Sequence, residues 1–229
     1  MLRFDSVFLA YSARGIESRI VLNIPSWNLA RGTHALLRGV SGSGKTSFFN
    51  IAAGLLRPTS GEVYLDDQPL YRLSEAARDR VRSAKVGYMF QMHHLMPGFT
   101  ALENVLMPMM FLQTIPTARR RARALDLLGA VGLSDFAQHR PHQLSAGQRL
   151  RVSAARALAN EPVMVLADEP TAALDALSSA LVLDMLQSVC RMNYASLIVA
   201  SHDPLLAARF SVVYDLRDGH LSESEIAPA

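Results

Sequence analysis

The chain has 229 residues, a formal net charge of +3 and one cysteine, and half of its residues are hydrophobic. This length suffices for one large domain with a hydrophobic core, and the lone Cys190, which we expect in that core, cannot form an internal disulfide, as is typical of a reducing compartment such as the cytoplasm. The net charge is too small to indicate a nucleic-acid-binding protein, since the basic residues are scattered apart from RRRAR at 119–123.

Strand-like runs separated by turns form the first third of the chain: RFDSVFLAY, RIVLNIPSWNLA and THALLRG. The N-terminus has no basic region followed by a long apolar stretch, so it predicts a first strand rather than a signal peptide. The third run leads into Gly39–Thr46 (GVSGSGKT), and a helix is expected to follow from Lys45 to Leu55.

The segment GVSGSGKT matches the phosphate-binding loop pattern, in the strand–loop–helix context that this pattern requires. Its glycines let successive backbone N–H groups turn around phosphate oxygens, and the helix adds its positive end. We expect Lys45 to reach the β- and γ-phosphates and Thr46 to coordinate Mg²⁺. The alternative is a tight Gly/Ser turn. The predicted nucleotide-binding residues here are Gly39, Ser41, Gly42, Ser43, Gly44, Lys45, Thr46 and Ser47.

A mainly helical segment is predicted from about Ser74 to Arg140. Within it, Val86 to Ala118 carries one formal charge, Glu103, but prolines and polar residues interrupt it, so the chain is not expected to span a bilayer. Adjacent His93 and His94 are interpreted as structural or interface residues rather than metal ligands. Six of the ten methionines lie here, and they favour an adaptable contact surface, with core packing as the alternative. They are Met89, Met92, Met96, Met107, Met109 and Met110.

Strands and helices alternate again in the last third: strands at 163–167, 196–200 and 211–216, and a helix over roughly 176–192. This order predicts a parallel sheet with a helical insertion. The first of these strands ends in Asp168 and Glu169. Asp168 is expected to hold Mg²⁺ and Glu169 to act as a general base on the attacking water, against the alternative of a capped strand that turns at Pro170.

The segment LSAGQ at 144–148 precedes an Ala-rich helix that is expected to end near Asn160. Ser145 is a natural N-cap for this helix. Together with Gly147 it would present a hydroxyl and a backbone N–H at a positive helix end, which predicts a second anion site. Taken alone, the segment is no more than a capped helix.

In their order, the phosphate loop, LSAGQ, VMVLADEP, the AALD at 172–175 and the SHD at 201–203 resemble the ATP-binding cassette (ABC) family over essentially the whole chain. The resemblance implies an α/β fold, a P-loop NTPase cassette with a mixed sheet core, an N-terminal antiparallel β subdomain and an α-helical insertion subdomain. We predict one ABC ATPase domain over 1–229, with its core at 1–90 and 160–229 and its helical subdomain at about 91–159.

The resemblance also implies roles for single residues. Gln91 resembles the Q-loop glutamine, a Mg²⁺ ligand, and Asp175 the D-loop aspartate. His202 resembles the switch histidine that contacts the γ-phosphate. Tyr11 resembles the aromatic that stacks on adenine, although an ordinary strand aromatic is the alternative. The predicted cofactors are ATP and Mg²⁺. The catalytic residues are Glu169, His202 and Lys45, and the metal-binding residues are Thr46, Gln91 and Asp168.

In this family, two cassettes enclose two nucleotides head to tail, so the resemblance implies a homodimer in which Ser145 and Gly147 close over the partner's nucleotide. It also implies permease subunits that contact the region Gln91 to Met110, and hence a peripheral location on the cytoplasmic face of the inner membrane. No nucleic-acid partner is expected. Three departures from the family pattern suggest a divergent member: Ala146 in place of the first glycine of the LSGGQ pattern, the apolar Leu150 where a polar residue is frequent, and Thr33 where a glutamate is common.

The stretch HHLMPGFTALENVLMPMM, with GAVGL and HRPHQLSAGQ, is similar to the branch that includes lipoprotein-release (LolD-type) and macrolide-export (MacB-type) cassettes. A cell-division cassette of the FtsE type, which transmits force without moving a substrate, remains open as an alternative. A cassette acting on DNA or ribosomes would need a coiled-coil insertion or a tandem cassette. An importer cassette is disfavoured because no regulatory domain follows Gly219.

Overall fold

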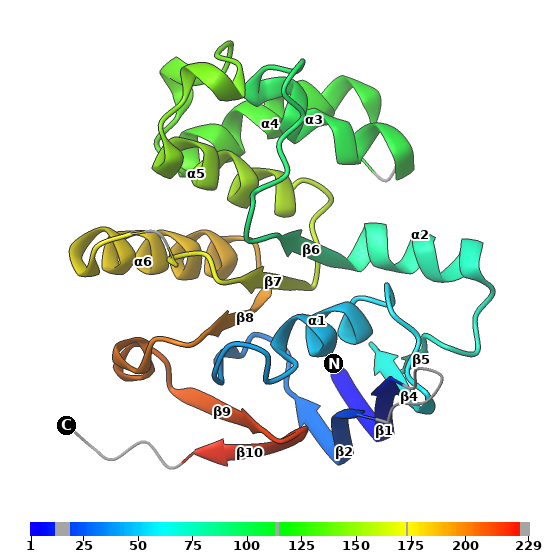
Figure 1. The fold of residues 1–229 in the computed structure, drawn as a ribbon. Coiled ribbons are helices and arrows are strands. Elements are labelled where there is room, and N and C mark those ends of the chain that lie inside the picture. The colour runs from blue at the N-terminus through cyan, green and yellow to red at the C-terminus, as the bar shows by residue number, and fades with distance from the viewer. Residues whose placement is uncertain (12–18, 113–114, 173, 225–229) are drawn as a thin grey trace. The chain divides into compact units, whose positions relative to one another are not determined.

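The computed structural model describes residues 1–11, 19–112, 115–172 and 174–224. It divides into two compact units. Unit 1 comprises Met1–Arg82 and Ile198–Ala229, and unit 2 comprises Ser83–Leu197. Helix α2 (Glu75–Lys85) and strand β8 (Ser196–Ser201) each cross a boundary between them (Figure 1). The predicted division at 91 and 159 stays a prediction.

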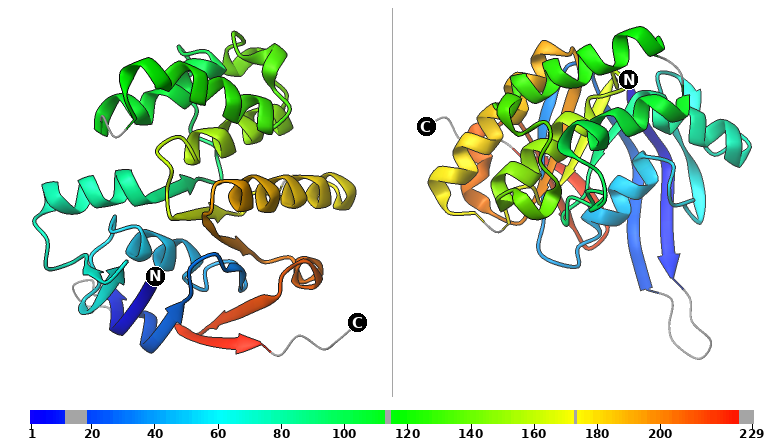
Figure 2. Two further views of the ribbon diagram at one scale, coloured as in Figure 1. Left: turned by 180° about the vertical axis from the view of Figure 1, so that it is seen from behind. Right: turned by 90° about the horizontal axis from the view of Figure 1, so that it is seen from above.

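The N-terminal part of unit 1 is an antiparallel sheet of strand order β2-β1-β4-β5. The strands are β1 (Leu2–Tyr11), β2 (Arg19–Leu29), β4 (Ser60–Leu65) and β5 (Gln68–Pro69). Apolar side chains of β1 alternate between buried and more exposed positions, as a sheet with one packed face requires. The two long strands β1 and β2 form a ribbon that is seen clearly from above (Figure 2).

A second set of strands in unit 1 carries both kinds of pairing. Strand β3 (His34–Arg38) pairs in parallel with β9 (Val212–Arg217), and β9 pairs antiparallel with β10 (His220–Ser224). The short helix η3 (Pro204–Arg209) precedes β9. This combination confirms the mixed sheet that was expected from the sequence.

An aromatic cluster holds helix α1 (Lys45–Ala52) in unit 1. Phe48 of α1 stacks on Phe4 of β1 with ring centroids 4.7 Å apart, and it meets the edge of Trp27 at 5.2 Å. Trp27 in turn contacts Tyr214 of β9 at 5.3 Å. Such buried aromatic pairs add specific geometry to hydrophobic burial, so the start of α1 is fixed against the sheets.

Unit 2 contains a parallel strand pair and most of the helices. Strand β6 (Val86–Met89) pairs with β7 (Met164–Asp168), whose side chains are all buried. The helices α3 (Ala101–Leu112), α4 (Thr117–Ala130) and α5 (Ala146–Ala157) pack on one another (Figure 2). The remaining helices are η1 (Ser134–Phe136), η2 (Pro141–Gln143) and α6 (Ala176–Met192). This group of packed helices matches the expected helical subdomain.

The boundaries of several elements differ from the expectations. Helix α1 ends at Ala52 rather than Leu55, and α5 at Ala157 rather than near Asn160. Strand β6 lies inside the segment that was expected to be mainly helical, because its four residues pair with the buried strand β7. Over the described ranges, no helix is both long enough and apolar enough to cross a membrane.

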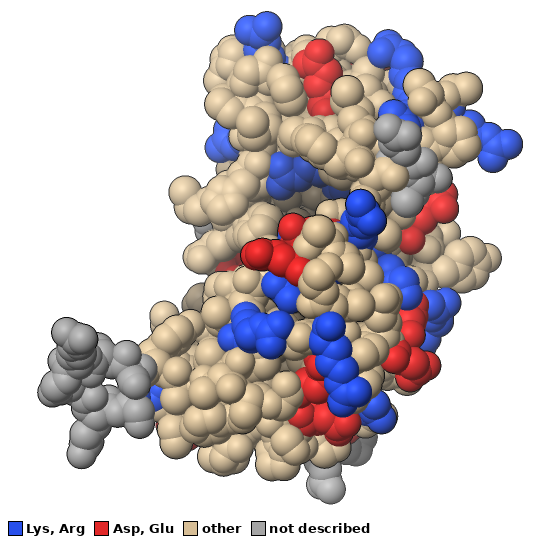
Figure 3. Space-filling model, turned by 90° about the vertical axis from the view of Figure 1, so that its right-hand side faces the viewer, with Lys and Arg blue, Asp and Glu red and all other residues tan. Residues whose placement is uncertain are grey.

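Charged side chains of both signs lie close together on the face drawn in Figure 3. The ion pairs of unit 1 include Arg31–Asp66 at 3.0 Å and Arg82–Asp79 at 2.8 Å. Exposed pairs of this kind contribute little to stability, typically up to about 1 kcal/mol each. They do balance charge locally, so the positive net charge is not gathered in one area of this face.

Candidate functional site

The loop between β3 and α1 is shaped by two glycines. Gly44 is the N-cap of α1 and has φ +105°, a left-handed conformation that side chains disfavour. A Cβ added to Gly39 would lie 2.8 Å from the Leu216 carbonyl oxygen, so a larger residue does not fit there. In the part of the chain that the structure describes, no side chain caps the N-terminus of α1, and the positive end of a helix attracts an anion.

Lys45 is held against the start of this loop. Its Nζ donates to the carbonyl oxygens of Gly39 at 2.7 Å and of Val40 at 3.2 Å, and the residue is only 7% exposed. A buried ammonium with these partners places a fixed positive charge at the loop. The position agrees with its predicted role toward phosphate.

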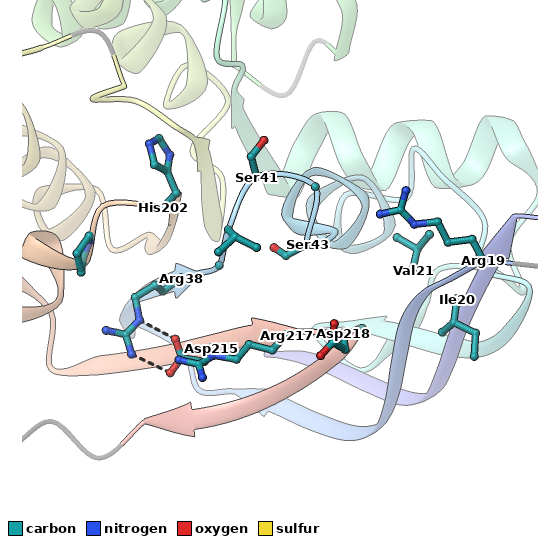
Figure 4. Close-up of a pocket in the computed structure, with 15 residues that line it drawn as sticks. Arg19, Ile20, Val21, Arg38, Ser41, Ser43, His202, Asp215, Arg217 and Asp218 are labelled. Atoms are coloured by element: carbon teal, nitrogen blue, oxygen red, sulfur yellow. Dashed lines mark hydrogen bonds and ion pairs between the residues drawn. The ribbon is translucent and has the colours of Figure 1, made fainter.

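A pocket of about 850 Å³ opens beside the loop, entirely within unit 1. His202 lies at one side of it and the loop at another (Figure 4). The Ser43 hydroxyl, which lines the pocket, is buried and has no hydrogen-bond partner in the described structure. The lining residues are Arg19, Ile20, Val21, Arg38, Gly39, Val40, Ser41, Gly42, Ser43, His202, Pro204, Asp215, Arg217, Asp218 and Gly219.

The donors of the loop and pocket fit a phosphate group. Three arginines and a histidine line the pocket against two aspartates, and the unpartnered Ser43 hydroxyl could donate to an oxygen. The N-terminus of α1 and the Lys45 ammonium add positive charge. Unit 1 therefore brings together the predicted phosphate loop and the predicted switch residue His202.

In unit 2, two strand ends bring three further predicted residues close in register. Met89 of β6 pairs with Ala167 of β7. Gln91 lies two residues beyond the end of β6, Asp168 is the last residue of β7, and Glu169 follows it. Asp168 is buried, and Glu169 adopts φ +48°. A left-handed backbone is uncommon for a non-glycine residue and is often found at functional sites. Carboxylates at the carboxyl ends of parallel strands are where active sites collect.

The turn after Gln91 is fixed by an arginine from α5. His93 and His94 have φ +59° and +44°, and Arg156 donates to both of their carbonyl oxygens, at 2.6 Å and 2.7 Å. Burial and the neighbouring Arg149 and Arg156 lower the pKa of His93. The backbone of both histidines thus belongs to the turn that Arg156 holds, and their interpretation as structural or interface residues stays a prediction.

Ser145 and Asp175 both cap helices. The Ser145 hydroxyl accepts from the Gln148 N–H at 3.2 Å, and Gln148 accepts from the Ser145 N–H at 2.8 Å, a capping box that confirms the predicted N-cap. Asp175 accepts from the N–H and hydroxyl of Ser178, which lowers the pKa of its carboxyl. Ser145 and Asp175 are exposed at the starts of α5 and α6. The AALD segment also includes residue 173, which lies outside the described residues.

Tyr11 is the last residue of β1 and is half exposed. It pairs across the sheet with Arg19, which lines the pocket, but Tyr11 itself does not line it. The structure thus places Tyr11 beside the pocket, and its stacking role stays a prediction.

Comparison with known proteins places the chain in a family. A family model described as "ABC transporter" matches residues 22–172. The chain belongs to the ABC transporter family. It is 35% identical to MJ0796, described as a bacterial ABC transporter cassette, over the whole of both chains, with a TM-score of 0.88. One MJ0796 structure is described as a dimer in a post-hydrolysis state bound to ADP and Pi.

A second similar structure is cbiO1 from Clostridium perfringens, described as part of the ABC transporter complex cbiONQ. It is 25% identical, with a TM-score of 0.85, over 96% of this chain and 86% of that one. The chain is thus an ABC cassette with the P-loop NTPase fold, and it is an ATP hydrolase.

Several pocket residues of the cassette were not predicted as site residues. Arg38 and Asp215 form an ion pair at the wall of the pocket. Arg217 ends β9, and Asp218 and Gly219 form the turn between β9 and β10. An Asp-Gly pair between two strands is typical of a β-hairpin turn, so the sequence could have predicted this turn. No pattern in the sequence links Arg38 to Asp215, which are 177 positions apart.

The structure of α5 explains two departures from the family pattern in and near the LSAGQ segment. Leu150 is buried, so its apolar side chain serves the packing of α5. Ala146 is the first residue of α5, where a methyl group is well tolerated by the helix. Cys190 is buried as expected, and burial raises the pKa of its thiol to about 12.

Proposed function

We propose that this cassette is the ATP-hydrolysing subunit of a membrane ABC transporter complex of the lipoprotein-release or macrolide-export type, in which ATP-driven closure moves a membrane partner. The observation that carries this proposal is an apolar surface in unit 2 that follows Gln91. It includes the exposed side chains of Met92, Met96, Phe99, Met110 and Phe111.

This apolar surface is built from a loop and the end of α3. Phe111 is 78% exposed, whereas Met89 and Met109 are buried in the core. Of the six methionines of the segment, two are thus buried, three are exposed and Met107 is intermediate. Exposed apolar side chains can serve a protein contact, and methionine adapts to varied partners.

The buried side-chain amide of Asn104 holds the loop that carries Met96 and Phe99. Asn104 of α3 is fully buried, and its side chain donates to the carbonyl oxygens of Met96, Phe99 and Thr100 and accepts from the Met96 N–H. The amide shares its two N–H donors among these three carbonyl groups and accepts through its oxygen, and together these contacts fix the loop geometry. A preorganised apolar loop supports docking of a permease, since little ordering entropy would be lost on binding.

For the hydrolytic step, we propose the roles that the family implies. Lys45 and the backbone of the phosphate loop bind the phosphates. Thr46, Gln91 and Asp168 carry the hard oxygen donors that Mg²⁺ prefers, and these residues would hold the ion. When bound, Mg²⁺ would neutralise negative charge on the phosphates. Glu169 orients the attacking water and takes its proton, and His202 contacts the γ-phosphate. Tyr11 stacks on adenine.

We also propose that the working form is a homodimer of 1–229 cassettes. Ser145 and Gly147 at the start of α5, with Asp175 at the start of α6, would contact the nucleotide of the second copy. Their placement at helix N-termini supports this role, because such termini favour anions. The dimeric state of the similar MJ0796 cassette also supports it. Such a complex would place the cassette peripherally on the cytoplasmic face of the membrane.

The FtsE-type alternative uses the same closure to transmit force without moving a substrate. The apolar surface is compatible with both kinds of partner, and the motifs at 93–110 and 139–148 scarcely separate the two types. The identity of the membrane partner separates the two. A permease with a large extracytoplasmic domain supports transport, and a division protein supports the alternative.

The test is membrane association of the tagged cassette in its own cells. Phe111→Glu places a charge on the apolar surface and is expected to move the cassette from the membrane fraction to the supernatant, with ATPase activity of the purified protein retained. Tyr194→Glu is the matched control, because Tyr194 is an exposed aromatic of unit 2 outside this surface. Equal membrane association of both variants and the wild type would count against the docking surface.

A further inference from the structure

A half-buried ion pair lies directly before the phosphate loop. Arg38 is the last residue of β3, and Asp215 faces it across the parallel pairing with β9. Arg38 Nε donates to Asp215 Oδ1 at 2.6 Å and Nη2 donates to Oδ2 at 2.8 Å (Figure 4). Such a two-bond pair fixes both the distance and the orientation of the guanidinium.

Asp215 has a second partner, so the pair belongs to a three-strand network. Its carboxylate also accepts from the hydroxyl of Ser224 on β10. The carboxylate is 13% exposed and the guanidinium 28%, so solvent only partly screens the pair. The hydrogen bonds from Arg38 and Ser224 favour the charged form and lower the pKa of Asp215 to about 2. The network is therefore fully ionised at neutral pH.

The backbone connects this network to Lys45. Gly39 follows Arg38 directly, its N–H donates to the Ser201 carbonyl at 3.3 Å, and its carbonyl accepts from Lys45 Nζ at 2.7 Å. A shift of Arg38 would move this carbonyl and with it the principal acceptor of the Lys45 ammonium. Displacements well below 1 Å are enough to weaken a charge-assisted hydrogen bond.

We propose that Arg38 is a positioning residue of the ATPase site, which Asp215 and Ser224 hold in place so that the Gly39 carbonyl orients Lys45 toward the nucleotide phosphates. This inference rests on the proposed role of the phosphate loop. The hairpin β9–β10 thereby takes part in nucleotide binding, although it lies far from the phosphate loop in the sequence.

Arg38 also lines the pocket, which gives a distinct alternative: direct contact with the nucleotide. The two possibilities differ in what Asp215 does. If Arg38 acts by positioning, loss of the Asp215 charge weakens ATP binding. If Arg38 binds phosphate itself, loss of Asp215 frees the guanidinium and binding is retained or strengthened.

The experiment is a double-mutant cycle with Arg38→Met, Asp215→Asn and the double variant, reading the Kd for ATP, kcat and the melting temperature. Each single variant is expected to raise Kd about tenfold, and the double variant to do so by the same factor rather than their product, since both remove one interaction. Arg38→Lys, which keeps the charge but not the fork, should recover part of the loss. Arg31→Met is the matched control, because Arg31–Asp66 is an ion pair of unit 1 outside the pocket.

Three results would overturn the positioning role. The first is a raised Kd for ATP in Arg38→Met together with an unchanged Kd in Asp215→Asn. The second is an unchanged Kd in both single variants, and the third is that their effects on Kd multiply in the double variant. Should Arg38→Met fail to fold, Asp215→Asn and Arg38→Lys decide the question, because both keep the length of the side chain. Lys45→Ala run in parallel separates the assumptions. Unchanged ATP binding by Lys45→Ala refutes the loop assignment itself. Loss of ATP binding by Lys45→Ala, together with an unchanged Kd in the Arg38 and Asp215 variants, refutes only the positioning role.

Discussion

The two units present their predicted functional residues in different ways. In unit 1, Lys45 is buried and hydrogen-bonded, and glycine conformations shape the loop around it. In unit 2, Gln91, Ser145 and Asp175 lie exposed at a strand end or at helix starts. The residues proposed to bind phosphate are thus preorganised inside one unit, whereas the residues proposed to face the second copy or the membrane partner lie where another molecule can reach them.

The largest effect on ATP affinity is expected from the preorganised side of this comparison. Lys45→Ala removes the ammonium that Gly39 and Val40 hold, and ATP affinity should fall by about a hundredfold or more. Binding of a fluorescent nucleotide measures this loss. Lys85→Ala, at the end of α2, is the control for a lysine change elsewhere. Wild-type affinity of the Lys45 variant would show that unit 1 does not hold the phosphates.

The next effect tests unit 2. Glu169→Gln removes the proposed general base without changing the side-chain shape, so turnover should fall by a factor of about 10² to 10⁴ while ATP still binds. The variant should then form an ATP-dependent dimer, which light scattering after size-exclusion chromatography detects. Glu161→Gln is a control, because this exposed carboxylate pairs with Arg123 at 3.3 Å. A monomer with bound ATP would contradict the proposed dimer mechanism.

The smallest effect sharpens the account of unit 1 through pH. The pKa of Asp215 is about 2, below its ordinary value, so its contribution to stability is complete above about pH 4 and is lost as pH falls toward 2. The contribution is on the order of 1 to 2 kcal/mol. Urea unfolding of the wild type and of Asp215→Asn at about pH 7 and pH 3 should show a smaller decline in the variant. Equal declines would mean that the Arg38 pair does not stabilise the carboxylate.

The sequence by itself determined the parts of the site whose chemistry depends on local order. The order of residues in Gly39–Thr46 was enough to predict a phosphate-binding loop, and Ser145 caps its helix through Gln148, three positions away. Asp168 and Glu169 end a run of apolar residues that predicts a buried strand. The order of these motifs was enough to predict the family and the fold class, because each motif has a fixed place in the fold.

Only the tertiary structure decided the contacts between residues far apart in the chain. The sequence shows that the middle segment is rich in methionine, but it does not show which of these side chains are buried. Packing in the folded chain buries Met89 and Met109 and leaves Met92 and Met110 exposed. In the same way, Arg38 meets Asp215 because β3 and β9 pair in one register. Sheet register and helix packing depend on the whole set of buried side chains, so such partners cannot be found from local pattern alone.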